Sequence, residues 1–431
     1  MTVQGKLSRR EMLKWLGVSA SVAALSACQP GVAPAQQGNV NAPAAAGAGN
    51  LTYWFFVGGP NLDNQKKLVE EYNSSTSGAK VTLEHTPEIK EKTLAAYAAG
   101  NPPNVTWYPT GGWGALGFAN TGGVIPLDDY VAKDYADQQT DFYEFLWKAN
   151  VWKGKLWGVP LDTNNLAWFY NEDKFKEAGI KPLDTNPTWD QLVEMLKALT
   201  KPNQWGYQVS PEARYFYDFL KQAGGELANE DYSKTLVNSP EGEATLKWLR
   251  DMVYEWKISP NPPMEKGFET GVVAMEYEGS YRIPPYRKLT DIKVAALRTT
   301  KNKVPFTVNG GESLQIWKTK AETQDASWSF VKWMTSKETV TKWAIASGYL
   351  PVRKSAAASD DFKKVLEEDP LRKVFVDELE YGGFWLATPY GDEVYTAVTD
   401  AVNTVLLKDA NIKETLGGLE TKLNNVLAGK I

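Results

Sequence analysis

The residue types that can catalyse reactions or bind ligands occur in very different numbers in this 431-residue chain. It holds 17 Trp and 20 Tyr, but a single His (His85) and a single Cys (Cys28). A His/Cys zinc cluster and an intrachain disulfide therefore lack partners, and any His-based catalytic group would have to use His85. His85 follows a strand-like run in a polar context, so we expect it to be exposed. Trp and Tyr combine a flat apolar face with a polar edge, which suits contact with a molecule that is half apolar and half hydroxylated.

The overall composition is that of a globular protein with an acidic surface. Hydrophobic residues make up 43% of the chain and charged residues 23%, which excludes disorder, collagen and coiled coil as the main architecture. The formal net charge is −5, and a chain this acidic is a poor binder of nucleic acid. Walker and dinucleotide motifs are missing, and acidic runs such as Asp128-Asp129 lack the spacing of a calcium loop. We expect no cofactor, no metal and no catalytic residue.

The N-terminal residues resemble an export signal. Ser8–Lys14 reads SRREMLK, which is similar to the twin-arginine motif, and an apolar stretch follows from Trp15 to Ala27. This stretch is shorter than the ~20 residues that span a bilayer, but it has the length of a signal-peptide core. It ends in LSAC, which resembles a lipobox, so residues 1–27 are predicted to be a twin-arginine-type lipoprotein signal peptide and Cys28 to carry lipid.

The residues that follow Cys28 differ from the rest of the chain. Gln29–Asn50 contains no charge and consists mainly of Ala, Gly, Pro, Gln, Asn and Val. Such a composition cannot bury a core, so residues 28–50 are predicted to be a flexible tether. The protein would then be extracytoplasmic and anchored to the cell membrane, or periplasmic, but not embedded in the bilayer.

The remaining chain alternates strand-like and helix-like segments. Thr188 with Gln191 forms a capping box, Ser239-Pro240 is a helix start, and Gly348 ends a helix that begins at Ser336. This alternation predicts an α/β fold with largely parallel sheets, and about 380 residues of it predict two α/β lobes. The expected strands lie at 51–57, 79–84, 105–108, 156–159, 166–170, 205–209, 272–277, 292–297 and 313–317.

One segment of the body is unusual because it carries no charge. Thr93–Leu127 is interrupted by several Gly and Pro residues, so it cannot be a membrane-spanning helix. It is either buried packing or the wall of a neutral pocket.

Several short blocks, in the same order along the chain, resemble those of family 1 extracellular solute-binding proteins. These proteins are receptors of ABC importers, and the chain is most similar to their sugar-binding branch. It departs from the family pattern at Asn104, where Asp is usual, and at Tyr281, where Trp is usual. The matching blocks are AGNPPNV (99–105), FANTGGVIPLD (118–128), WGVP (157–160) with WFYNED (168–173), TWDQL (188–192), FETGVVAM (268–275) with GSY (279–281), GG (310–311) with the helix at 326–334, and GYLP (348–351).

The resemblance implies a fold like that of the maltose-binding protein, with two discontinuous lobes joined by a hinge. Lobe one would comprise 51–161 plus 312–350, and lobe two 163–307 plus 352–431. The chain would cross between them near Asp162, Asn309 and Pro351. The ligand would lie between the lobes, at the carboxyl ends of the sheets.

The expected ligand contacts follow from this resemblance and from local context. Tyr281 occupies the family's stacking position, whereas Asp162 and Asn164 follow the Gly-Val-Pro strand at the first crossing and would bind hydroxyl groups. Each of these side chains could instead have a purely structural role: an aromatic ring could pack in the hydrophobic core, and Asp162 could cap local backbone. The full set is Trp54, Tyr108, Trp113, Asp162, Asn164, Arg214, Tyr215, Tyr281, Gly310, Gly311, Glu312 and Trp385.

The leading interpretation is a monomeric, lipid-anchored receptor that binds a carbohydrate and delivers it to the permease subunits of an ABC transporter. An exported glycoside hydrolase is an alternative, because it also uses aromatic rings and two carboxylates, although no barrel-like repeat supports it. A third alternative keeps the receptor fold but binds a polyamine, a glycerol phosphodiester or a metal chelate. A polyamine site would need more carboxylates, and a phosphodiester site more basic residues, than the uncharged segment 93–127 contains.

Overall fold

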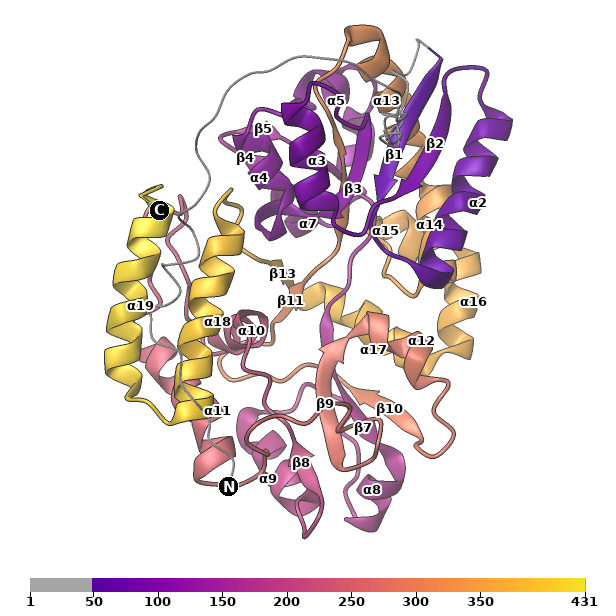
Figure 1. Cartoon of the computed structure of the whole chain (residues 1–431). Coiled ribbons are helices and arrows are strands. Elements are labelled where there is room, and N and C mark those ends of the chain that lie inside the picture. Colours follow the sequence, from indigo (N-terminus) through magenta and orange to yellow (C-terminus); the bar gives the residue numbers. More distant parts are fainter. Residues whose placement is uncertain (1–48, 431) are drawn as a thin grey trace, which may run out of the picture. The chain divides into compact units, whose positions relative to one another are not determined.

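The computed structural model of the protein describes residues 49–430 (Figure 1). The predicted signal peptide, the lipid attachment at Cys28 and nearly all of the tether lie outside the described residues. Within the described part of the chain, no helix is long and apolar enough to cross a membrane.

The first sheet has five strands in the order β2-β1-β3-β12-β6. Alternate residues of β1, such as Tyr53 and Phe55, are fully buried in a core that includes Phe330 and Trp343. Helix α2 packs against β2, and α13 against β1 (Figure 1). We call this sheet and these helices the first-sheet region. Its elements are β1 (Asn50–Phe55), β2 (Lys80–His85), β3 (Val105–Pro109), β6 (Val159–Pro160), β12 (Glu312–Ile316), α2 (Gly59–Ser75), α13 (Ala321–Met334) and α14 (Lys337–Ser347).

The second sheet has four strands in the order β10-β7-β9-β8, and its central strand β7 is buried on both faces. Trp168 belongs to a core shared with α10, whereas Phe169 packs on the opposite face against Phe375 of α17. We call this sheet and its covering helices the second-sheet region (Figure 1). Its elements include β7 (Leu166–Asn171), β8 (Trp205–Tyr207), β9 (Val273–Gly279), β10 (Val294–Leu297), α9 (Trp189–Leu199), α10 (Ala213–Gln222) and α17 (Pro370–Asp377).

The remaining elements are mostly helical. Helices α18 and α19 pack on each other, and both contact α11. The other bounds are α3 (Ile89–Ala98), η1 (Gly111–Trp113), α4 (Ala115–Asn120), α5 (Asp128–Asp134), α6 (Ala136–Gln139), α7 (Glu144–Lys148), β4 (Val151–Trp152), β5 (Lys155–Leu156), α8 (Glu172–Glu177), α11 (Pro240–Tyr254), η2 (Ser280–Arg282), α12 (Ile283–Tyr286), β11 (Thr307–Asn309), α15 (Lys354–Ala357), α16 (Asp360–Glu368), η3 (Glu378–Tyr381), β13 (Gly382–Phe384), α18 (Gly391–Lys408) and α19 (Ile412–Leu427).

The local signals read from the sequence are confirmed at three helices. The Thr188 side chain accepts from the Gln191 backbone and Gln191 returns the bond, which completes the capping box of α9. The Ser239 hydroxyl accepts from the backbone of α11. Helix α14 ends at Gly348, whose φ of 84° is a left-handed conformation that favours glycine.

The prediction of largely parallel sheets is wrong, because both sheets are mixed. Only β1–β2 and β1–β3 are parallel in the first sheet, and only β8–β9 in the second. Strand β12 runs antiparallel to β3 and β6, and β7 runs antiparallel to β9 and β10. Strand β12 is antiparallel because of its connectivity. The chain forms all the strands of the second sheet between β3 and β12, so no single crossover helix joins these two strands.

Two crossing segments join the sheets and lie side by side. Residues 161–165 run from β6 to β7, and residues 310–311 run from β11 to β12. The Gly310 amide donates to the Asn164 carbonyl at 2.8 Å, and the Asn164 amide donates back at 3.2 Å. Thr163 also pairs with Leu350. The strands of the two sheets are distributed as the predicted lobe boundaries require, and those boundaries stay a prediction.

Candidate functional site

The crossing segments bring five of the expected site residues together: Asp162, Asn164, Gly310, Gly311 and Glu312. Gly311 has a φ of 129°, and a Cβ built on it would lie 2.4 Å from the Asp162 carbonyl oxygen. No other residue fits this backbone at such close approach. The Gly310-Gly311 pair is therefore explained by chain crossing, which sets the positions of the polar side chains beside it.

Asp162 and Glu312 form a buried carboxyl pair at this crossing. Asp162 is 1% exposed, and its Oδ2 accepts from Nε1 of Trp107 at 3.1 Å and of Trp343 at 2.6 Å. Its Oδ1 accepts from the Glu312 amide at 3.0 Å. Burial, followed by the charge of Asp162, raises the pKa of Glu312 well above its usual value, and burial also raises the pKa of Asp162. Both Asp162 oxygens are engaged by the protein itself, which favours a role in holding the crossing over a grip on ligand.

A second group of polar side chains surrounds Arg214. The expected site residues Arg214 and Tyr215 both lie in the first turn of α10. Arg214 Nη2 donates to Asn164 Oδ1 at 2.8 Å, and Nη1 lies 3.5 Å from the Tyr281 hydroxyl. Its Nε is buried without a hydrogen-bond partner. Arg214 thus connects the crossing segment to the second-sheet region and keeps one donor unused.

Glu278, at the end of β9, organises the tyrosines of this group and was not expected from the sequence. Its Oε1 accepts from the Tyr215 hydroxyl at 2.6 Å, and its Oε2 from the Tyr281 hydroxyl at 2.5 Å. The available signal was the alternation of Glu276 and Glu278 with apolar residues in an otherwise buried strand. We call Asn164, Arg214, Tyr215, Glu278 and Tyr281 the polar cluster.

Tyr281 differs from the other aromatic side chains because its ring is accessible. It is 37% exposed, whereas the other Trp, Tyr and Phe side chains that the structure describes are buried or half-buried. The Arg214 guanidinium lies 5.9 Å from the ring centroid, and Glu278 fixes the hydroxyl. A flat apolar face is therefore held at the surface with donors and acceptors at its edge.

The other expected aromatic contacts do not join the polar cluster. Tyr108 is 8% exposed and its ring lies 4.6 Å from that of Phe118, in a hydrophobic cluster against which Trp54 also packs. Trp385 is 1% exposed, and its Nε1 donates to the Gly391 carbonyl at 3.3 Å. Trp113 belongs to η1, and its side chain is not among those described.

Two other expectations about isolated features can be compared with the structure. His85 is exposed, as predicted, and its Nε2 lies 3.2 Å from the Phe56 carbonyl oxygen. Much of the uncharged segment 93–127 is buried packing, and a Cβ on Gly112 would lie 1.7 Å from the Leu386 carbonyl oxygen.

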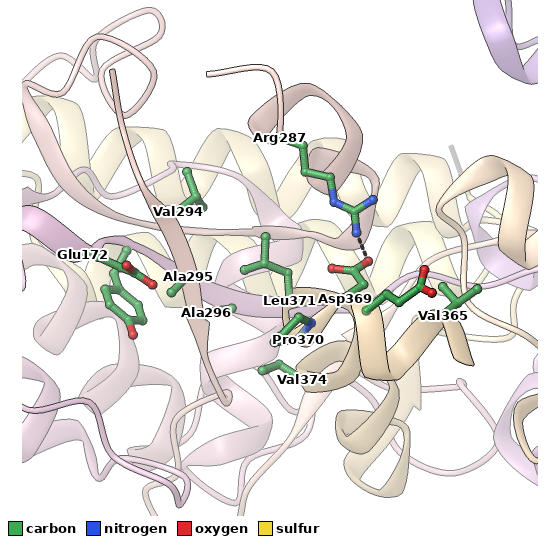
Figure 2. A pocket seen from close by; sticks show the side chains of 12 residues that line it. Glu172, Arg287, Val294, Ala295, Ala296, Val365, Asp369, Pro370, Leu371 and Val374 are labelled. Atoms are coloured by element: carbon green, nitrogen blue, oxygen red, sulfur yellow. Dashed lines mark ion pairs between the residues drawn. The ribbon is translucent and has the colours of Figure 1, made fainter. Parts of the chain in front are cut away.

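Two pockets in the second-sheet region differ in their position relative to the polar cluster. The larger, of about 660 Å³, lies beside β10 and α17, and none of the expected site residues lines it. Figure 2 shows its Arg287 and Asp369 side chains pointing toward one another as an ion pair, with apolar side chains such as Val294 and Leu371 around them. The smaller pocket, of about 330 Å³, is lined by Tyr215 and Glu278 and therefore adjoins the polar cluster.

Comparison with known proteins identifies the family. Residues 67–372 match the model of the bacterial extracellular solute-binding proteins. The chain is 23% identical over 386 residues to a maltotriose-binding protein of Pyrococcus abyssi, an alignment that covers 86% of this chain and 81% of that protein.

Solved structures show the fold. The cyclic α-maltosyl-1,6-maltose binding protein of Arthrobacter globiformis superposes with a TM-score of 0.81 at 24% identity, over 88% of this chain and 99% of that one. UgpB of Mycobacterium tuberculosis, in complex with glycerophosphocholine, gives 0.77 at 18% identity, over 89% and 100%. The expected fold, like that of the maltose-binding protein, is confirmed. The chain belongs to the bacterial extracellular solute-binding protein family.

Proposed function

We propose that this protein is the carbohydrate receptor of an ABC importer. The observation that carries the proposal is the exposed Tyr281 ring, held by Glu278 and bordered by Arg214. A sugar ring has C–H-rich faces and hydroxyl-rich edges, so an aromatic face covers the former while polar neighbours bind the latter. The maltotriose-binding relative and the maltosyl-maltose-binding structure support a sugar as the ligand.

The proposed contacts divide into two kinds. Tyr281 stacks on the sugar, and one stacked ring supplies about 0.5–1.5 kcal/mol beyond the area it buries. Asn164, Arg214 and Tyr215 bind hydroxyl groups, and the unpartnered Arg214 Nε and Glu312 Oε2 are satisfied by ligand. Asp162, Gly310 and Gly311 position these groups. Tyr108 and Trp385 are buried and contribute only if the protein rearranges on binding, whereas ligand contacts by Trp54 and Trp113 stay predictions.

The proposed mechanism is closure of two lobes around the ligand, with the crossings near Asp162, Asn309 and Pro351 as the hinge. Small-angle scattering with saturating ligand should then give a smaller radius of gyration than without it. An unchanged scattering curve at saturation would contradict closure.

The proposed location is outside the cytoplasm, with a lipid on Cys28 after removal of a twin-arginine-type signal peptide and a tether that ends near Asn50. The family description supports an extracellular position. In a lipid-modifying host, Cys28→Ala should release the protein from membranes. Equal membrane fractions of wild type and Cys28→Ala would contradict the anchor.

A panel of solutes tests the function directly. Thermal-shift screening should find a stabilising neutral carbohydrate, and calorimetry should confirm one site per monomer without turnover of the sugar. Spermidine and glycerophosphocholine belong in the panel because they represent the polyamine and phosphodiester alternatives. Binding of either, without any carbohydrate, would overturn the proposal, and carbohydrate hydrolysis would favour the glycosidase.

A further inference from the structure

Apart from the crossings, a further contact joins the elements around β3 to the beginning of α18 (Figure 1). Ile89 of α3, Tyr108 of β3 and Phe118 of α4 share one hydrophobic cluster, so this group of elements belongs with the first sheet. Trp385, before α18, and Val394, within it, belong instead to the core shared with α10 of the second-sheet region. The contact therefore joins two groups of elements that pack in separate cores.

Two glycines meet at this contact with no room for a side chain. A Cβ built on Gly391, the first residue of α18, would lie 1.7 Å from the Gly112 carbonyl oxygen. A Cβ on Gly112, in η1, would lie 1.7 Å from the Leu386 carbonyl oxygen, so both obstacles are backbone atoms. Neither glycine has a left-handed φ, so close approach and not backbone conformation explains the missing side chains. An alanine at either position fits only if the two segments move apart.

An ion pair lies beside the glycines. Nζ of Lys90, on α3, donates to Oδ2 of Asp392, the residue that follows Gly391. The two side chains are 42% and 40% exposed, so the pair lies at the solvent-facing edge of the contact and can separate without leaving a buried charge. Burial would lower the pKa of Lys90, but its hydrogen bond to Asp392 and the charge of that residue raise it above the usual value. An exposed ion pair is weak on its own, so it adds to a contact that the glycines make possible.

We propose that Lys90, Gly112, Gly391 and Asp392 form a latch that stabilises the closed arrangement of the two lobes, an inference that rests on the closure in the proposed function. Segment η1 begins next to a crossing, where the Thr110 amide donates to the Gly311 carbonyl at 2.9 Å, so rotation about the crossings changes its distance from α18. A contact that exists only in the closed state shifts the equilibrium toward that state. It thereby raises the affinity for whatever binds between the lobes.

The alternative is permanent packing, in which the glycine contact never separates. Gly391→Ala distinguishes the two accounts. In permanent packing the added methyl group overlaps with the Gly112 backbone in every molecule, so the melting temperature falls while the radius of gyration stays the same. With a latch, opening relieves the overlap, so the protein stays folded and its radius of gyration increases.

The first experiment is small-angle scattering of the protein without carbohydrate, together with its melting temperature. The control for Gly391→Ala is Gly117→Ala in α4, where a Cβ would lie 3.9 Å from the Pro389 carbonyl oxygen, an ordinary contact with the same segment. We expect a larger radius of gyration in Gly391→Ala than in wild type or Gly117→Ala, with similar melting temperatures in all three. An unchanged radius in Gly391→Ala would overturn the latch, whatever its melting temperature.

The second experiment uses charge reversal at the surface and does not depend on the glycine variant being folded. Lys90→Glu places a like charge opposite Asp392, and adding Asp392→Lys restores the attraction. The control is Lys422→Glu, which places a like charge opposite Asp400 at an ion pair between α19 and α18, inside one group of elements. We expect Lys90→Glu to increase the radius of gyration, the double variant to return it toward wild type, and Lys422→Glu to leave it unchanged. The same change in both single variants, or no rescue in the double variant, would contradict the latch.

Affinity gives a third readout once the panel has identified a carbohydrate. Calorimetry with the tightest-binding neutral carbohydrate should show binding at least about tenfold weaker in Gly391→Ala and about two- to fivefold weaker in Lys90→Glu. Wild-type affinity in both variants would count against the latch. Because the scattering experiments need no carbohydrate, the latch can fail while the panel finds a sugar, and the panel can fail while the latch is confirmed.

Discussion

Tyr108 and Tyr281 both lie at or just beyond the end of a strand, yet the two regions of the molecule use them differently. Tyr108, in β3 of the first sheet, is 8% exposed and packs on Phe118. Tyr281, after β9 of the second sheet, is 37% exposed and donates to Glu278. Strand β3 pairs on both edges and packs on both faces, whereas η2 carries Tyr281 beyond the end of the sheet. Position relative to the covering layers, and not residue type, separates the buried ring from the accessible one.

The carboxylates show the same contrast. Asp162 accepts three hydrogen bonds from buried donors of the protein, including two indole N–H groups. Glu278 accepts from two tyrosine hydroxyls beside an accessible ring. The first arrangement fixes backbone segments, and in the proposed function the second presents groups to a ligand.

The largest expected effect is on stability and comes from Tyr108→Ala. Removing this buried ring should lower the free energy of unfolding by about 3–5 kcal/mol, because a cavity forms beside Phe118. Tyr281→Ala should cost less, about 0.5–1.5 kcal/mol, because the ring is partly exposed and the main loss is its hydrogen bond to Glu278. Urea denaturation of both variants measures the difference, and equal losses would remove the distinction between the regions.

Asp162→Asn should also act mainly on stability. The amide oxygen can still accept from both indole N–H groups, but the N–H₂ group then faces the Glu312 backbone N–H, which is also a donor, so we expect a loss of about 1–3 kcal/mol. Asn164→Asp, on the neighbouring part of the same crossing, is the matched control, because Asn164 faces Arg214 rather than the core. A stable Asp162→Asn protein with weakened ligand binding would instead assign Asp162 to the ligand.

Tyr281→Ala should cost roughly 1–3 kcal/mol of ligand binding, or about 5- to 150-fold in affinity, because the stacking face is lost and water enters. Tyr281→Trp should retain binding, since it enlarges the same face. Calorimetry on the folded Tyr281→Ala and Tyr281→Trp proteins measures both affinities. Wild-type affinity in Tyr281→Ala would mean that the ring does not touch the ligand.

A smaller effect is expected from pH, and it should originate in buried carboxyls: Asp162 and Glu312 at the crossing, and Asp218, Glu276 and Glu378 elsewhere. Burial raises the pKa of Asp218 to about 7 and of Glu276 and Glu378 to about 8. Because these folded-state values exceed the unfolded ones, the stabilisation is complete below about pH 4 and is lost as the pH rises toward 8. We therefore expect a melting temperature several degrees higher near pH 5.5 than near pH 8.5. Glu378→Gln should reduce this dependence, whereas the exposed Glu322→Gln should not; a flat profile in wild type would contradict the buried, protonated carboxyls.

Local structure was predictable from the sequence, but long-range pairing was not. The caps at Thr188 and Ser239 and the stop at Gly348 depend on neighbours within four residues, and the structure has all three. The antiparallel direction of β12 depends on a path through the second sheet that no local pattern records. Glu278 was missed because a carboxylate in a strand is read as a surface residue until its tyrosine partners are placed. Tyr108 and Trp385 were expected to face a ligand because of their places at a strand end and beside glycines, but such local context does not show which face of an element a ring occupies, and both rings are buried.

The central claim is that the polar cluster around Tyr281 holds a sugar, and the structure of a complex with the tightest-binding neutral carbohydrate tests it most directly. A sugar ring should stack on Tyr281, with hydroxyl groups within hydrogen-bond distance of Asn164 and Arg214. A sugar bound in the pocket beside β10, or one that leaves Tyr281 uncovered, would contradict the account.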